Sequence, residues 1–529
     1  MLLTLTALGG LGLIAAGVAA IVFFVFLLPP KHPKNIPAIP FWVALLPFFK
    51  DVDQSDIFHK YMDKPLRTHG AVKLFFGAQW NLVVHRPSFL AEMFRDEDMY
   101  QKSGNQKKIP HSVLAMFLGD NIISSHGTTW KTYQAVVKPC LQQKFDSSLI
   151  AKNTAKLCVL IRQATQKAGD GGGIAVQELL QRYSVANCSE ILLDMETQAL
   201  ERADAPLNVL QTAVKREIFQ PVFMNFPVLD RLPFPSRKRA RALVAAFKNE
   251  LKSALVQGGG GGGGRKVSES KPKPGLGRGM LDAAETGRWS EKQLLDNLTV
   301  LFVAGQENPQ LLMISTLYLL AKHPVVQDAI LDEMSEQGTV NNKSADNQQL
   351  QELPYLTSVI YECLRLLPPI GQLINRQVDS DVVLGGGIFI PRGTYVGYNC
   401  YSTNRSPEAW GPDANEFRPE RWGSTHEQIQ RQYRQRRARA EFISFHGGRR
   451  ACLGERFAML QMRVLLTVLV RQFRWWLDPT WVDRKTPVSG ASSCFSAGPL
   501  YPRALRLVFA NRQEESSAGS DLGGGGPKL

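Results

Sequence analysis

A lone cysteine in a glycine-rich turn places the strongest constraint on how this 529-residue chain can fold. The stretch from Phe445 to Gly454 reads Phe-His-Gly-Gly-Arg-Arg-Ala-Cys-Leu-Gly, and apolar residues follow it at helical spacing over 455–473. Cys452 is therefore expected just before the N-terminus of a buried helix, where free backbone N–H groups lower the pKa of a thiol. The glycines let the backbone turn sharply and approach a flat partner closely.

Several roles are open to Cys452 on this evidence. It could be a small buried residue in a turn, a zinc ligand or a nucleophile. His446 is the only nearby histidine and no other cysteine lies close in sequence, which weakens the last two roles. The seven cysteines form no C-x-x-C pair, so a disulfide scaffold and a common zinc ribbon are disfavoured. A stabilised lone thiolate suits the role of a strongly donating axial ligand of a haem iron.

The pattern Phe445-x-x-Gly448-x-Arg450-x-Cys452-x-Gly454 resembles the haem-binding loop of cytochrome P-450 monooxygenases. Three further motifs follow that family's order, namely His126-Gly127-x-x-Trp130, Glu362-x-x-Arg365 and Phe417-Arg-Pro-Glu-Arg421-Trp422. The resemblance implies a mainly α-helical fold with small β-sheets, haem b as cofactor and Cys452 as the iron ligand. It also implies further cofactor contacts from Trp130, Arg376, Phe445, Gly448, Arg450 and Gly454, and a buried structural network of Glu362, Arg365 and Arg421.

One position departs from that family's pattern. Gln134 stands where an arginine often follows Trp130, which puts one contact to a haem propionate in doubt. Arg376 and Arg450 remain as guanidinium partners for the propionates.

Hydrophobic patterning predicts one mixed domain over residues 41–510. Residues 71–76 and 80–85 indicate a hairpin, and Val382–Ile390 with Thr394–Tyr398 indicate a second strand-rich patch. The longest helix is predicted over Glu291–Lys322, with Ser290 and Gln293 forming a capping box at its start. Residues 511–529 are rich in Gly and Ser and are expected to form a flexible tail.

Within the long helix, the run Ala304-Gly305-Gln306-Glu307-Asn308-Pro309 resembles the family's oxygen-binding groove. That resemblance implies catalytic roles for Ala304, Gly305, Glu307 and Asn308. Asn308 replaces the usual threonine, and an asparagine is not a ready proton source. Either Asn308 positions a relay water fed by Glu307, or the substrate supplies a polar group. The plainer alternative is a helix-interior asparagine bonded to a carbonyl.

The overlapping run Gly305-x-Glu-Asn-Pro-Gln310, together with the stretch from Gln101 to Gly127, resembles the fungal P-450s that form dityrosine in spore walls. This implies oxidative coupling of N-formyl tyrosine. Two alternatives stay open: a general monooxygenase that hydroxylates a sterol, fatty acid or secondary metabolite, and a non-catalytic haem-binding membrane protein. By family position, substrate contacts would come from the 105–123 segment, Phe302, Val303, Ile370, Leu373 and the turn Ser492–Phe495.

Residues 1–28 contain no charged side chain and would reach about 42 Å as a helix, enough to span a bilayer. The segment lacks the basic start of a cleaved signal peptide, which favours a retained transmembrane anchor. Lys31 and Lys34 follow it, so the N-terminus is expected in the lumen and the rest on the cytoplasmic side. Residues 29–40 form a proline-rich spacer, and the expected location is the endoplasmic reticulum membrane.

The formal net charge of +15 suits an acidic partner. Five arginines between positions 431 and 439 could steer the acidic face of an NADPH-cytochrome P-450 reductase, or could simply be solvated. The family resemblance implies that NADPH and flavins act through that separate reductase, with cytochrome b5 as a possible second donor. A second cluster at 237–241 is expected near lipid headgroups. Aromatic interleaving is absent, so nucleic acid is not an expected partner.

Overall fold

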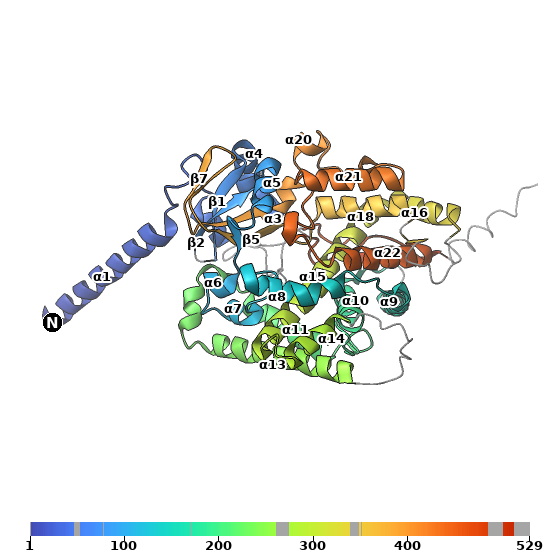
Figure 1. Cartoon of the computed structure of the whole chain (residues 1–529), viewed down its shortest axis with the longest axis horizontal. Coiled ribbons are helices and arrows are strands. Elements are labelled where there is room, and N and C mark those ends of the chain that lie inside the picture. Colours follow the sequence, from blue (N-terminus) through green and yellow to red (C-terminus); the bar gives the residue numbers. More distant parts are fainter. Residues whose placement is uncertain are drawn as a thin grey trace, which may run out of the picture.

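The computed structural model describes residues 2–46, 53–77, 79–169, 171–260, 275–338, 349–350, 352–484 and 501–512. Helices make up most of the body, and the largest sheet lies at one side of it, close to the end from which the N-terminal helix projects (Figure 1). The predicted fold class, mainly α with small sheets, is therefore confirmed. Ser492–Phe495 and residues 513–529 of the expected tail lie outside the described residues.

The larger helices and strands have the following bounds. The helices are α1 Leu2–Val22, α3 Gln54–Ile57, α4 Asp63–His69, α5 Pro87–Arg95, α6 Asn105–Lys108, α7 Val113–Leu118, α8 Gly127–Leu141, α9 Ser147–Ala168, α10 Gln177–Ala186, α11 Pro206–Ile218, α12 Pro221–Asn225, α13 Pro235–Gly260, α14 Leu276–Glu285, α15 Glu291–Lys322, α16 Pro324–Glu336, α18 Pro354–Leu366, α19 Cys400–Thr403, α20 Pro407–Trp410, α21 His426–Ala438 and α22 Glu455–Gln472. The strands are β1 Ala71–Phe76, β2 Gln79–Val84, β3 Tyr100–Lys102, β4 Ile174–Ala175, β5 Gln372–Val378, β6 Val382–Leu384, β7 Ile388–Ile390, β8 Tyr395–Asn399, β9 Phe473–Leu477 and β10 Arg506–Asn511.

Helix α15 is the central element of the body, and most of its side chains are buried. It begins and ends at the predicted residues. Its start is stabilised by a capping box, in which the Ser290 side chain accepts from the Gln293 N–H and the Gln293 side chain accepts from the Ser290 N–H. Helices α10, α13, α14 and α18 pack against it. Residues 304–309 therefore lie in the interior of the molecule.

The largest sheet has the strand order β1-β2-β8-β5-β3. β1 and β2 form the predicted hairpin, with Ala71 opposite Val84. β5 pairs with β8 in antiparallel fashion, but the pairing shifts register between Ile374 and Arg376. A bulge of this kind re-aims the side chains around it, and here it changes what Asn375 and Arg376 face.

The N-terminal segment consists of α1 followed by a short π-helix over Phe23–Leu27. It projects from the body (Figure 1), and large apolar side chains such as Leu13 and Ile14 stay exposed. Among the described residues, none of the helices combines the length and apolar character needed to traverse a lipid bilayer.

The end of the expected proline-rich spacer is part of the folded body. Ile39 N–H donates to the Lys73 carbonyl at 2.9 Å, and Lys73 N–H donates to the Pro37 carbonyl at 2.8 Å. Ile36 and Ile39 are buried. These contacts fix the chain beside β1 before residue 41, where the domain was expected to begin.

Candidate active site

The cysteine loop has the close backbone geometry that its glycines predict. Cys452 N–H donates to the Phe445 carbonyl at 2.9 Å and closes the loop just before α22. Gly448 has a φ of +64°, and a Cβ there would lie 2.2 Å from the backbone oxygen of Phe94 in α5. Only glycine fits such a contact.

The pKa of the Cys452 thiol differs from the lowered value expected from the sequence. Burial raises the pKa of its thiol to about 11, while the backbone N–H groups of Gly454 and Glu455 act in the opposite direction. Desolvation therefore outweighs the helix N-terminus. The thiol has accessible surface, and Cys452 lines a cavity of the protein. A metal cation bonded to the sulfur would displace the proton outright.

The cavity encloses about 1470 Å³ of empty space, part of it open to solvent. Ten of the fifteen predicted catalytic, cofactor, metal and substrate residues with described positions line it: Trp130, Ala304, Gly305, Asn308, Ile370, Leu373, Phe445, Arg450, Cys452 and Gly454. The other five of this group are not part of its lining: Phe302, Val303, Glu307, Arg376 and Gly448. Phe302 and Val303 are core residues of α15. Phe495, another predicted substrate contact, lies outside the described residues.

A buried cluster of cations surrounds one carboxylate beside this cavity. Arg376 Nη1 and Arg450 Nη1 each lie 2.8 Å from an oxygen of Glu97. Lys102 Nζ lies 3.1 Å from Asn375 Oδ1 and 3.3 Å from His446 Nε2, and it lines the cavity. Burial, followed by Arg376 and Arg450, holds the pKa of Lys102 well below its usual range. The cluster is therefore short of negative charge.

Sequence reasoning found Arg376 and Arg450 but missed Lys102 and Glu97. Arg376 faces Glu97 and the Tyr100 carbonyl, and its Nε and Nη2 have no partner. Arg450 also donates to the carbonyls of Ile122 and Ser125, and its guanidinium lies 4.5 Å from the centre of the Trp130 ring. In the sequence, Lys102 was noted only as part of the stretch from Gln101 to Gly127, which resembles the dityrosine-forming P-450s.

These residues fit the expected haem. The cavity presents one thiol at a closed backbone loop and an indole ring at its edge. Beside them lie three buried cations with a single carboxylate among them. Additional carboxylates, such as the two propionates of a haem, would balance that cluster. The unpaired N–H groups of Arg376 agree with a positive site that is incompletely neutralised.

On α15, Ala304 and Gly305 both line the cavity. A Cβ on Gly305 would lie 2.8 Å from Cys188 Sγ in the neighbouring π-helix Asn187–Leu192, so helix packing also requires this glycine. Asn308 Nδ2 donates to the Ala304 carbonyl at 3.4 Å, which is the plainer alternative considered above. Its Oδ1 is buried without a hydrogen-bond partner, and the residue lines the cavity, so Asn308 has one unpaired acceptor next to that space.

Glu307 lies away from the cavity lining. Its Oε1 is 3.5 Å from Lys215 Nζ of α11, and both side chains are largely buried. Burial raises the pKa of Glu307, and Lys215 partly offsets that shift. Consecutive helical residues point about 100° apart, which separates this carboxylate from Asn308. The structure therefore brings Glu307 together with Lys215, and its proposed feeding of a relay water stays a prediction.

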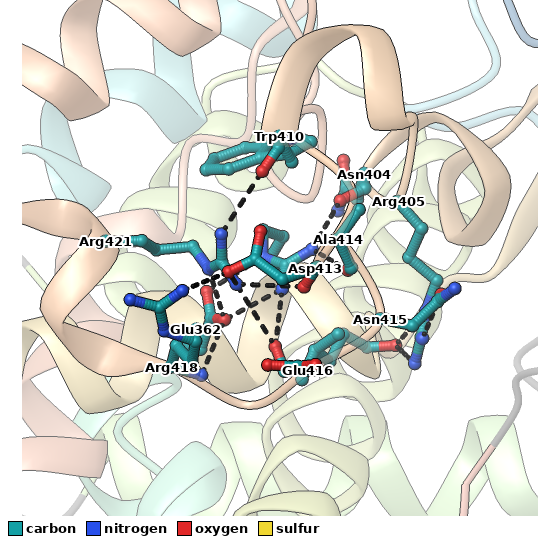
Figure 2. Close-up of polar contacts among 12 residues, drawn as sticks. Glu362, Asn404, Arg405, Trp410, Asp413, Ala414, Asn415, Glu416, Arg418 and Arg421 are labelled. Carbon is teal, nitrogen blue, oxygen red and sulfur yellow. Dashed lines mark hydrogen bonds and ion pairs between the residues drawn. The ribbon is translucent and has the colours of Figure 1, made fainter.

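The buried network of Glu362, Arg365 and Arg421 forms as predicted. Figure 2 shows Arg421 reaching Glu362 within it. Glu362 accepts from Arg365 Nε and Nη2 and from Arg421 Nε, each at 2.8 Å. It also accepts from Trp422 Nε1 at 3.0 Å and from the Arg418 backbone N–H at 3.1 Å. The side chains of Glu362 and Arg365 are fully buried.

This network reaches the cysteine loop through Asn404. Arg365 Nη1 donates to the Asn404 carbonyl at 3.1 Å. The Asn404 side chain accepts from Ile443 N–H at 3.0 Å and donates to Ser444 Oγ at 2.8 Å. Ser444 directly precedes Phe445, so the ion-pair network helps to position the start of the loop.

The two arginine-rich segments differ from each other in exposure. On α21, Arg436 and Arg437 pair with Glu441 and Glu455 within the chain. Arg431, Arg434 and Arg439 are exposed. In the other segment Arg237 is buried, with its guanidinium 3.7 Å from the Phe223 ring centre. The expectation that this segment as a whole faces lipid headgroups is therefore wrong for Arg237.

Comparison with known proteins agrees with this geometry. The family model for Cytochrome P450 matches residues 33–492. The chain is 40% identical over 490 residues to Cytochrome P450-DIT2 of Saccharomyces cerevisiae, covering 92% of this chain and 95% of that protein. It is 38% identical over 465 residues to Cytochrome P450 monooxygenase xanG of Aspergillus fumigatus, covering 87% and 86%. The crystal structure of cytochrome P450DA heme domain shares the fold, with a TM-score of 0.70 at 19% identity, covering 92% of this chain and 97% of that one. The chain therefore belongs to the cytochrome P450 family.

Proposed function

We propose that this cytochrome P450 monooxygenase couples two molecules of N-formyl tyrosine through their phenol rings, toward dityrosine of a fungal spore wall. Membership of the family makes the chain a monooxygenase and implies haem as its cofactor. The choice of substrate is supported by the resemblance of residues 101–127 and 304–310 to dityrosine-forming P-450s, and by the 40% identity to Cytochrome P450-DIT2.

The observation that carries the proposal is the free acceptor of Asn308. Its Nδ2 is engaged by the Ala304 carbonyl, so the unpartnered Oδ1 can only accept a hydrogen bond. A phenolic O–H is a donor that meets this requirement. A tyrosine-derived substrate would thus satisfy a buried polar atom that a hydrocarbon would leave unpaired.

In the proposed site, Cys452 would hold the iron, and Lys102, Arg450 and Trp130 would hold the edge of the haem that bears the propionates. When bound, the haem supplies the reduction of O2 and the one-electron oxidation of the phenol. Arg376 supports the edge indirectly, because it shares Glu97 with Arg450. The Glu362 network positions the loop through Asn404 and Ser444.

The coupling balances as follows. Each phenol loses one hydrogen atom, and one bond forms between the two rings. Together they supply two electrons and two protons. Two further electrons come from NADPH through a separate flavin reductase, two further protons come from NADPH and solvent, and O2 is reduced to two waters. The exposed arginines of α21 would attract an acidic reductase face.

We further propose that the N-terminal segment anchors the protein in the endoplasmic reticulum membrane, with the catalytic domain on the cytoplasmic side. The segment has no charged side chain before Lys31, and α1 projects from the body with exposed apolar residues (Figure 1). Retention of the full chain in membranes after alkaline carbonate washing, and its release on deletion of residues 2–28, would support this.

A second candidate is hydroxylation of a lipophilic molecule, which the apolar lining of the cavity and the relative named Cytochrome P450 monooxygenase xanG favour. Product analysis separates the two. Purified holoenzyme with reductase, NADPH and N-formyl tyrosine should yield the ring-coupled dimer. NADPH consumption without any dimer, or a hydroxylated monomer as the sole product, would contradict coupling. Membership of a monooxygenase family removes the support for a non-catalytic haem-binding protein.

A further inference from the structure

We propose that Lys108 binds the carboxylate of the substrate in a side chamber next to the main cavity. This inference rests on the proposed function and names the residue that binds the carboxylate of an aromatic substrate such as N-formyl tyrosine. Neither the haem-binding motifs nor the groove of α15 assigns any role to Lys108.

The side chamber adjoins the cavity that contains Cys452. Three residues, Ile123, Leu373 and Asn375, line both spaces. Lys108 lines the chamber and not the main cavity. A substrate that spans the shared boundary would place one end near α15 and the other beside Lys108.

The ammonium group of Lys108 is held in place with donor capacity to spare. Its Nζ donates to Asn81 Oδ1 at 2.7 Å and to the Phe76 carbonyl at 3.3 Å. Asn81 is buried, and its Nδ2 donates to backbone carbonyls of β1 and β2, which fixes the direction of Oδ1. An ammonium has three N–H groups, so one is not taken up by these two oxygens, and the nearest ring, that of Tyr395, has its centre 5.0 Å from Nζ.

The charge of Lys108 is not balanced by a neighbouring acid. None of the described residues that line the chamber is acidic, and none of the described carboxylates forms an ion pair with Lys108. Burial alone lowers the pKa of Lys108 to about 7. A buried cation without a counter-ion is costly, and a bound carboxylate would remove that cost.

Asn375 provides an independent second donor. It is buried on β5 at the boundary of the two spaces, and its Nδ2 has no partner while its Oδ1 accepts from Lys102. An ammonium and an unpaired amide N–H, both on residues that line one space, pair with oxygen acceptors. An N-acyl amino acid has both kinds, a carboxylate for Lys108 and an acyl oxygen for Asn375.

Equilibrium binding to the ferric holoenzyme tests this without turnover. The change in the Soret band reports the Kd for N-formyl tyrosine and for its methyl ester, which lacks the negative charge. Lys108→Gln should raise the Kd of the acid by about tenfold or more and leave that of the ester within about twofold. The matched control is Lys107→Gln, because Lys107 is the exposed neighbour on α6, and it should change neither Kd.

Equal weakening of acid and ester by Lys108→Gln, or no preference of the wild type for the acid, would overturn the inference. If the Lys108→Gln variant does not load haem, the pH dependence of binding to the wild-type protein provides the test. Its preference for the acid should fall as the pH rises above the range in which Lys108 stays charged, and a constant preference would count against Lys108.

The same measurements separate this inference from the proposed function. The second probe pair is 4-hydroxyphenylacetic acid and its methyl ester. A preference for both acids that depends on Lys108, without ring-coupled product, supports the role of Lys108 and refutes coupling. Ring-coupled product from N-formyl tyrosine with equal binding of acid and ester supports coupling and refutes the role of Lys108.

Discussion

Substituting Gly448 by alanine tests how far the cysteine loop depends on close backbone contact. The new Cβ would lie 2.2 Å from the Phe94 oxygen, whereas unbonded carbon and oxygen atoms approach to about 3.3 Å. The loop or α5 must therefore move by about 1 Å. A displacement of that size at a reacting centre can reduce activity by about 100-fold.

Gly386 provides a matched control, because it has a φ of +71° and nothing lies within 4 Å of its Cβ position. Gly386→Ala has the same backbone strain, about 1 kcal/mol, without the collision. Two readouts apply to both variants: the fraction of protein with the thiolate-type carbon-monoxide spectrum, and the urea midpoint from tryptophan fluorescence. Gly448→Ala should lose most of the thiolate fraction, and Gly386→Ala should keep it. Equal thiolate fractions in the two variants would refute the reasoning.

Two further substitutions test buried charges. Glu362→Gln leaves Arg365 and Arg421 without their shared counter-charge, which should cost about 3–5 kcal/mol; a urea midpoint equal to the wild type would argue that the network is dispensable. Lys215→Met removes the cation that lowers the pKa of Glu307, so Glu307 must be buried as an uncompensated charge at high pH. The stability lost relative to the wild type should therefore grow as the pH rises above the ordinary pKa of a glutamate, and a loss independent of pH would show that Glu307 stays neutral throughout.

Local signals predicted some elements of the structure well. The bounds of α15 follow from a capping box and from helical periodicity, both of which act within a few residues. The β1–β2 hairpin follows from two apolar runs around a glycine. The Glu362–Arg365 pair lies on one helix face, so its geometry was also available from spacing.

The charged edge of the cavity was predicted only in part, because its contacts are distant in sequence. Glu97 joins Arg376 and Arg450 across separations of 279 and 353 residues. The register shift in β5 then turns Asn375 toward the cavity and Arg376 toward Glu97. A pattern of residue types does not contain such a shift, which depends on how β5 pairs with β8. The pKa of Cys452 was misjudged for a similar reason, since burial is a property of the whole fold.

Three polar groups on residues that line the two connected spaces restrict the substrate more than the apolar lining does. Asn308 Oδ1 is an unpaired buried acceptor on α15, Asn375 Nδ2 is an unpaired buried donor on a residue at the shared boundary, and Lys108 Nζ is a cation in the side chamber that has two hydrogen bonds but no counter-ion among the described residues. A sterol or a plain hydrocarbon chain would leave the two amide atoms unpaired, at about 1–3 kcal/mol for each, and would leave Lys108 without a counter-ion. A molecule with a phenolic hydroxyl, an acyl oxygen and a carboxylate pairs with every one of them. These polar groups therefore indicate the substrate class, and substitution of Asn308, Asn375 or Lys108 removes each of them separately.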